Sequence, residues 1–159
     1  MKNTIHNPFR QSTPRTALIY IYVGALATQF TGLDIVLAQV LASMPEAKKA
    51  TTKRELASRY SEMVEALRKA AEKRTMDDAL RADTDRLVAR LVQAGRNRNR
   101  ILHSAWAAYA DGEVVQRQAR PAVGEPKNIT HAAFDVASIK MVIDEVMELR
   151  SDVPYLLGD

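Results

Sequence analysis

The chain has 159 residues, of which 47% are hydrophobic and 26% are charged, a composition typical of one ordinary soluble domain. It contains no cysteine, which excludes disulfide scaffolds, thiolate zinc sites, iron–sulfur clusters and cysteine nucleophiles. The formal charge of +4 attracts polyanions only weakly, so the position of the basic residues matters more than their sum. Low counts of Gly (6) and Pro (6), together with many Ala, Leu and Arg, predict an all-α fold.

The N-terminal part of the chain combines a polar lead-in with a long apolar segment. Residues 1–15 have no apolar periodicity and are expected to be mobile. Residues 17–27 are almost wholly apolar, and three interpretations compete: a signal peptide, a membrane helix and a buried central helix. Apolar residues continue at helical spacing as far as Leu41, through the small residues that a signal peptidase would accept. We therefore favour a buried helix that ends before Pro45.

Two amphipathic helices are predicted in the middle of the chain. Apolar residues between Leu56 and Ala71 recur at steps of one, three and four positions, which defines one face of a helix. Asp77 and Asp78 mark the start of the next helix, because the helix dipole favours negative charge at that end.

A break in this next helix is expected near Gly95. The basic cluster of residues 96–100 follows this glycine, and an apolar stripe then resumes through Trp106 and Tyr109. We interpret these two aromatic residues as core or dimer-interface residues rather than as platforms for RNA bases.

The C-terminal third is predicted to hold an insertion and a last helix. Residues 111–127 contain an Asp-Gly turn signal and two adjacent valines, which predicts a loop-rich or short hairpin insertion. Thr130 is the predicted cap of the last helix, whose apolar stripe begins at Val136. The whole pattern predicts a bundle of four to five helices in a single domain over residues 16–152, with a tail over residues 153–159.

Common catalytic motifs are absent from the chain: it has no HExxH, GxSxG, GxGxxG or P-loop sequence. His6 lies in the lead-in and His131 at the predicted start of the last helix, so neither is a strong catalytic candidate. His103 differs, because it lies beside the cluster of arginines.

The run Arg98-Asn99-Arg100-Ile101-Leu102-His103 follows the pattern Arg-Asn-x-x-x-His. It resembles the signature of the HEPN superfamily, helical proteins many of which are metal-independent ribonucleases. The surrounding layout is also similar to HEPN proteins, with two long helices upstream and a turn, a short extended piece and a closing helix downstream. The resemblance implies a HEPN-like domain that needs no metal or cofactor and that forms a homodimer with paired motifs facing one cleft.

The residue types fit the chemistry that the resemblance implies. An imidazole titrates near neutral pH, so His103 can move a proton during RNA cleavage. The guanidinium of Arg98 can stabilise charge on the phosphate, and Asn99 would orient the reacting groups. Arg96 is a rival for the role of Arg98, and together with Arg100 it could instead bind the RNA backbone.

The spacing of the motif raises a geometric difficulty. On an unbroken helix the five steps from Arg98 to His103 turn through about 500°, which leaves the two side chains about 140° apart. Three solutions are open: the helix begins only near Asn99, the long arginine reaches around, or a symmetry mate completes the site. Arg96 turns through about 700° to His103 and does share its face. Asp34, the only charge of the first apolar helix, could pair with an active-site arginine or point to solvent.

The resemblance implies a cytoplasmic endoribonuclease, without a membrane segment, that cuts single-stranded RNA and leaves a 2′,3′-cyclic phosphate. A toxin or defence role is expected, with a nucleotidyltransferase-type antitoxin as a further partner. The alternative is a noncatalytic HEPN-like helical module for dimerisation or binding. A third interpretation of residues 97–106 is an exposed basic turn whose histidine is satisfied locally.

Overall fold

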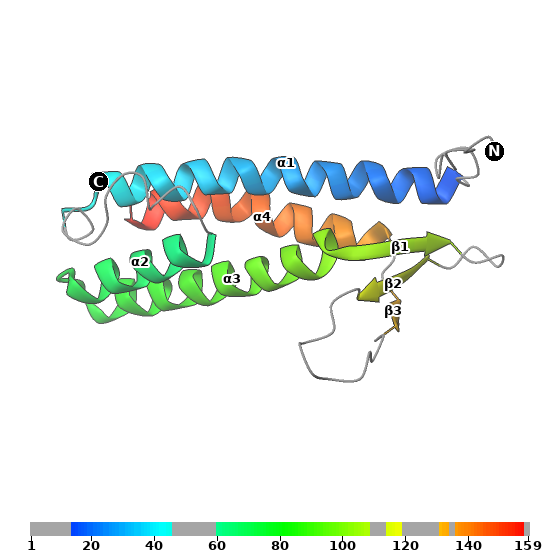
Figure 1. Ribbon diagram of the computed structural model, residues 1–159. Helices are drawn as coiled ribbons and strands as arrows, with labels where there is room; N and C mark the ends of the chain where they lie inside the picture. Colours follow the sequence, from blue (N-terminus) through cyan, green and yellow to red (C-terminus); the bar gives the residue numbers. More distant parts are fainter. Residues whose placement is uncertain (1–13, 46–59, 109–113, 119–130, 134–135, 158–159) are drawn as a thin grey trace, which may run out of the picture.

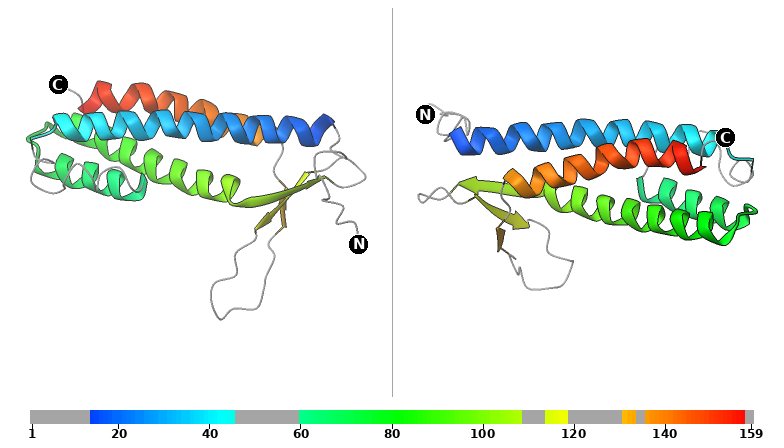
Figure 2. Two further views of the ribbon diagram at one scale, coloured as in Figure 1. Left: turned by 45° about the horizontal axis from the view of Figure 1, so that its top comes forward. Right: turned by 180° about the vertical axis from the view of Figure 1, so that it is seen from behind.

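The computed structural model describes residues 14–45, 60–108, 114–118, 131–133 and 136–157. In this part of the chain four helices form an elongated bundle: α1 (Pro14–Ser43), α2 (Tyr60–Lys73), α3 (Asp78–Leu102) and α4 (Val136–Leu157) (Figure 1). Helices α1 and α4 lie side by side, as do α2 and α3, so the bundle has two layers (Figure 2). The predicted all-α bundle is confirmed, and it has the lower of the two expected numbers of helices among the described residues.

A small antiparallel sheet extends from the end of the bundle where α3 ends and α4 begins (Figure 2). Its strands β1 (Ser104–Ala108), β2 (Val114–Gln118) and β3 (His131–Ala133) are ordered β1-β2-β3. Strands β1 and β2 pair from Ser104 with Gln118 to Ala108 with Val114. Of the predicted insertion over residues 111–127, the strand at the two adjacent valines is confirmed as β2, whereas its partners β1 and β3 lie outside the predicted bounds.

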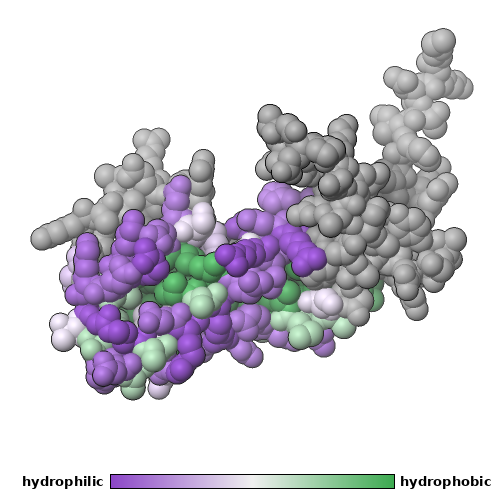
Figure 3. Space-filling model, turned by 90° about the horizontal axis from the view of Figure 1, so that it is seen from below, coloured by the Kyte–Doolittle hydropathy of each residue, from purple (hydrophilic) through white to green (hydrophobic). Residues whose placement is uncertain are grey.

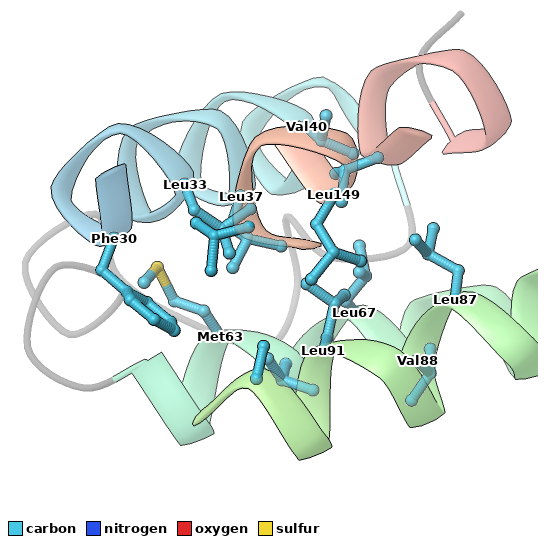
Figure 4. Packing of buried hydrophobic residues seen from close by; sticks show 14 of the residues in the cluster. Phe30, Leu33, Leu37, Val40, Met63, Leu67, Leu87, Val88, Leu91 and Leu149 are labelled. Atoms are coloured by element: carbon cyan, nitrogen blue, oxygen red, sulfur yellow. The ribbon is translucent and has the colours of Figure 1, made fainter. Parts of the chain in front are cut away.

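The core is formed by apolar side chains from all four helices (Figure 4). Helix α1 contributes residues spaced three and four apart, and Leu26, Phe30, Leu33 and Leu37 are each 0% exposed. Burying one such side chain contributes about 1.5–3 kcal/mol. The interpretation of this apolar segment as a bundle helix that ends before Pro45 thus agrees with the packing. Among the described residues, Ala17–Ser43 is also the one helical segment long and apolar enough to cross a membrane.

Polar contacts join α4 to both of its neighbours. Arg150 donates a 2.5 Å hydrogen bond to Gln29 of α1 and lies against Gly32, where a Cβ atom would be 2.7 Å from its guanidinium carbon. On the other side Arg90 of α3 forms ion pairs with three carboxylates of α4: Glu145 at 2.8 Å, Glu148 at 3.0 Å and Asp152 at 2.5 Å.

Helix α3 begins as predicted but does not break. Asp77 is its N-cap, and its carboxylate accepts a 2.7 Å hydrogen bond from the backbone N–H of Leu80. The expected kink near Gly95 is wrong, because α3 runs without interruption to Leu102. A glycine in a helix costs about 1 kcal/mol relative to alanine. A larger residue is disfavoured at this position, because a Cβ at Gly95 would lie 2.7 Å from the ring of Tyr60.

The prediction that an apolar helical stripe continues through Trp106 is wrong. Trp106 lies in β1, paired in register with Gln116, and Tyr109 lies outside the described residues. The i, i+3 spacing of the two aromatics suits a helix, but the backbone pairing with β2 decides the local structure.

The predicted start and end of the last helix are also corrected. Helix α4 begins at Val136 and β3 precedes it, so Thr130, which lies outside the described residues, does not cap α4. Helix α4 continues through Pro154 to Leu157, beyond the predicted domain boundary at residue 152. Val153 and Leu157 are both 0% exposed, because they extend the apolar stripe of the helix. At the other end, α1 begins at Pro14, inside the predicted lead-in.

Candidate functional site

A pocket of about 600 Å³ opens where α1, α2 and the last turns of α3 meet. Its polar lining comes from all three helices and consists of Asp34, Tyr60, Ser61, Glu65, Arg96, Arg98, Asn99 and His103. Its apolar lining consists of Met63, Val64, Val92 and Leu102, with Gly95 between the two sets. Seen from below, the bundle has hydrophobic surface between hydrophilic side chains (Figure 3). The pocket therefore offers both an apolar wall and a group of charged side chains.

Helix α3 with its C-cap supplies seven of the thirteen lining residues, and four of the seven lie on one face. Val92, Arg96, Asn99 and His103 follow one another at steps of four, three and four residues, the spacing of one helix face. His103 is the C-cap of α3, and its backbone N–H donates to the carbonyl of Asn99 at 3.1 Å. The side chains of Arg96, Asn99 and His103 are given no hydrogen-bond or ion-pair partner by the described residues.

Arg98 reaches the same pocket from the inner side of α3. Its position is about 60° from Gly95 and about 40° from Leu102 around the helix, and both of these residues line the pocket. The guanidinium carbon of Arg98 lies 5.3 Å from the centre of the Phe30 ring, a cation–π contact with α1. The geometric difficulty of the motif thus has an answer within one chain. Helix α3 does not begin near Asn99, and Arg98 and His103 border one pocket although their helix positions differ.

Tyr60 lines the pocket and joins α2 to both α1 and α3. Its ring meets Phe30 edge to face, with centroids 5.6 Å apart and an interplanar angle of 78°. Its hydroxyl donates a 2.7 Å hydrogen bond to the carbonyl of Leu91. Burial raises the pKa of Tyr60 well above its ordinary value, so this hydroxyl keeps its proton and acts as a donor.

Asp34 is the one residue of α1 that brings a carboxylate to the pocket. One of its oxygens, Oδ1, is buried without a hydrogen-bond partner among the described residues. Burial raises the pKa of Asp34, and the positive charge of Arg98 opposes that rise. Of the two alternatives open from the sequence, the structure therefore favours an interaction between Asp34 and an arginine of the motif over a carboxylate that faces solvent.

Besides Tyr60, two polar residues of the lining were not singled out from the sequence. Ser61 and Glu65 lie on the first turns of α2, where they look like ordinary residues of a solvated helix face. Hydrogen bonds from Arg68 lower the pKa of Glu65 to about 2, so Glu65 is ionised and its charge is balanced by a neighbour. Arg100, which the sequence analysis placed with the RNA-binding residues, is exposed and does not line the pocket.

The described residues form no group of three or more His, Asp or Glu side chains that could hold a metal ion. Comparison with known proteins gives no match, either to a family model, to a curated protein or to a solved structure. Any function must therefore be argued from the pocket itself.

Proposed function

We propose that this chain is a metal-independent endoribonuclease of HEPN type that cleaves single-stranded RNA. The observation that supports the proposal is the meeting of Arg98, Asn99 and His103, together with Arg96, at one pocket. Arg98, Asn99 and His103 belong to one short sequence motif. Their convergence is not an automatic result of the spacing, because Arg98 and His103 are about 140° apart on the helix.

The proposed reaction requires one proton transfer at each end of the scissile linkage. The 2′-oxygen attacks phosphorus and loses its proton, the bond from phosphorus to the 5′-oxygen breaks, and the 5′-oxygen gains a proton. The products are a 2′,3′-cyclic phosphate and a 5′-hydroxyl. His103 carries one of these protons, as base at the 2′-oxygen or as acid at the 5′-oxygen, and water carries the other; such catalysis contributes about 100- to 10,000-fold.

Arg98 is the proposed ligand of the nonbridging phosphate oxygens. Its guanidinium is always charged and presents a planar fork of N–H donors, which matches two oxygens of one phosphate. The loss of a comparable preorganised donor costs about 3 kcal/mol of transition-state stabilisation. Arg96 lies on the face of His103 and is the proposed contact of the neighbouring phosphate, and Arg100 would bind the backbone farther out.

The apolar wall of the pocket supports a subsite for a nucleobase. Val92 is 40% exposed, and both Val92 and Leu102 of α3 line the pocket. The pocket volume of about 600 Å³ falls within the range of small-molecule sites. A base against this wall would place its ribose phosphate near the arginines.

We also propose that the chain acts in the cytoplasm as a homodimer. Leu18, Ile21 and Ile35 of α1 are 41%, 65% and 54% exposed, an apolar surface that a second copy would cover. Sedimentation of the wild-type chain beside an Ile21→Lys variant tests this proposal. A monomeric wild type would contradict it.

The experiment that tests the nuclease proposal is cleavage of a fluorescent single-stranded RNA by the purified full chain in EDTA. We expect His103→Asn, which keeps a residue suited to a helix C-terminus, to lower the rate at least about 100-fold. Arg98→Ala should lower it by a similar factor, whereas Arg96→Ala should act more on KM. Arg86→Ala is the matched control, because Arg86 lies on the same helix, pairs with Asp83 and does not line the pocket.

Circular dichroism confirms that each variant keeps its helical content. Cleavage by pure His103→Asn at the wild-type rate would remove His103 from the mechanism, and a strict requirement for added metal would refute the metal-independent reaction. Salt-sensitive binding of RNA without any turnover would instead favour the noncatalytic binding module.

A further inference from the structure

We propose that Asp34 is a positioning residue that, with Phe30, holds the guanidinium of Arg98 in place for phosphate binding. The part of this proposal that concerns catalysis rests on the nuclease function proposed above. The part that concerns the fixed position of Arg98 does not, and it is tested separately below.

The sequence already makes Asp34 unusual. It is the only acidic or basic residue between Thr16 and Pro45, and it lies one residue after the fully buried Leu33. Asp34 follows Phe30 by four residues, so the two side chains lie one above the other on the same face of α1. A carboxylate in such surroundings opposes folding unless another group compensates its charge.

Arg98 is the cation whose charge acts on this carboxylate across the pocket, although no ion pair or hydrogen bond joins the two side chains. Oδ1 of Asp34 is buried and has no hydrogen-bond partner among the described residues, so a local hydrogen bond does not stabilise it. Burial raises the pKa of Asp34 and the charge of Arg98 lowers it, so the two groups interact through space. Tyr60 lines the same pocket, but its hydroxyl proton is donated to the carbonyl of Leu91.

In this arrangement the N–H donors of Arg98 can still reach a phosphate group. The Phe30 ring faces the guanidinium at 5.3 Å, and Tyr60 in turn fixes Phe30 by its edge-to-face contact. The contact places the guanidinium carbon over the ring, while the N–H donors lie around the rim of the planar group, where they can meet phosphate oxygens. Because the arginine is held before the substrate arrives, less conformational freedom is lost when phosphate binds.

The negative charge of Asp34 also affects how Arg98 would bind an anion. A nearby carboxylate weakens the simple attraction of Arg98 for any anion, so Arg98 would contribute more by geometry than by charge. Lysine keeps the charge but lacks the planar fork and the flat face that packs on Phe30. Arg98→Lys should therefore lose nearly as much activity as Arg98→Ala.

The first measurement follows the side chain of Arg98 by NMR on the full chain labelled with ¹⁵N-arginine. In the wild type we expect slow rotation about the Nε–Cζ bond of Arg98, assigned by its absence in Arg98→Lys. Asp34→Asn, which keeps the size of the side chain, should accelerate this rotation several-fold. Asp144→Asn is the matched control, because it makes the same change of charge at an exposed position on α4. Unchanged rotation in Asp34→Asn would overturn the positioning role, whether or not the chain cleaves RNA.

The second measurement follows cleavage of single-stranded RNA. We expect Asp34→Asn to lower kcat about 10-fold or more with a smaller change in KM, and Asp144→Asn to leave both unchanged. The double variant Asp34→Asn/Arg98→Ala should be no slower than Arg98→Ala alone, because Asp34 acts through Arg98. Additive losses in the double variant, or full activity of Asp34→Asn, would refute a catalytic consequence. An inactive wild type would refute the nuclease proposal while the NMR result still decides the position of Arg98.

Discussion

Substitution of Gly95 by alanine tests the packing beneath the pocket, because two opposite effects compete at this position. In a helix interior, glycine to alanine stabilises by about 1 kcal/mol through backbone entropy alone. At Gly95, however, the added Cβ would lie 2.7 Å from Cε1 and 3.0 Å from Cδ1 of Tyr60, closer than normal carbon contacts. The ring of Tyr60 must therefore move.

The movement has a definite cost. Overpacking of this kind costs about 1–3 kcal/mol, and displacement of the ring also weakens the hydrogen bond from Tyr60 to Leu91, which contributes about 0.5–1.5 kcal/mol. These costs exceed the gain in helix propensity. We expect Gly95→Ala to lower the free energy of unfolding by about 1–3 kcal/mol, measured by urea denaturation followed by circular dichroism.

Gly24 provides the matched control, since it lies inside α1 and no heavy atom lies within 4 Å of a Cβ added there. Gly24→Ala should stabilise the protein by about 0.5–1 kcal/mol. In a Tyr60→Ala background, Gly95→Ala should become stabilising as well, because the obstacle is gone. If Gly95→Ala stabilises the unmodified chain as much as Gly24→Ala does, the explanation for this glycine is refuted.

Three further predictions use the same unfolding measurement. The pKa of Asp34 is raised above 3.8 in the folded state, so the ionised carboxyl opposes folding. Asp34→Asn should therefore increase the free energy of unfolding at pH 7. The gain should fade below pH 3.8, where the carboxyl is protonated in both the folded and the unfolded state. A gain that is constant with pH would exclude charge as the cause. Asp77→Ala should cost about 1 kcal/mol through loss of the cap of α3, with a smaller loss for Asp78→Ala, and equal losses would contradict the capping role. Arg90→Met should cost about 1 kcal/mol at low salt and less in concentrated NaCl, since Arg90 is 36% exposed; a loss independent of salt would show that its packing matters more than its charge.

The bundle could be predicted from sequence because its signals are local. The apolar spacing of α1 around Leu33 and the acidic cap of α3 at Asp77 each depend on residues within a few turns of one another. The end of α4 was missed although its signal was local as well. Val153 and Leu157 continue its apolar stripe through Pro154, a residue that rarely stands inside a helix.

The errors elsewhere have nonlocal causes. Gly95 looked like a helix break, and only the position of Tyr60 on another helix explains why a glycine stands in an unbroken α3. Trp106 looked helical by its spacing, whereas its strand exists because β2 pairs with it.

The candidate site was likewise predictable only where its signals are local in the sequence. His103 and Arg98 were found from a short motif, which is a local pattern. Their shared pocket was not predictable, because the spacing on α3 separates them and the contact of Arg98 with Phe30 crosses from one helix to another. The position of Asp34 opposite the motif also depends on how α1 packs on α3. Such contacts between distant segments leave no periodic signal in a single sequence.

The single carboxylate of α1 also has a consequence during synthesis. Ala17–Ser43 leaves the ribosome before the helices that will cover it, at a time when it is hard to distinguish from a segment destined for lipid. On scales of insertion by the translocon, one aspartate near the middle of such a segment costs about 2.5–3.5 kcal/mol, whereas a leucine favours insertion by about 0.3–0.6 kcal/mol. Asp34 thus opposes lateral transfer of the nascent chain into the bilayer, and Asp34→Leu would remove that barrier.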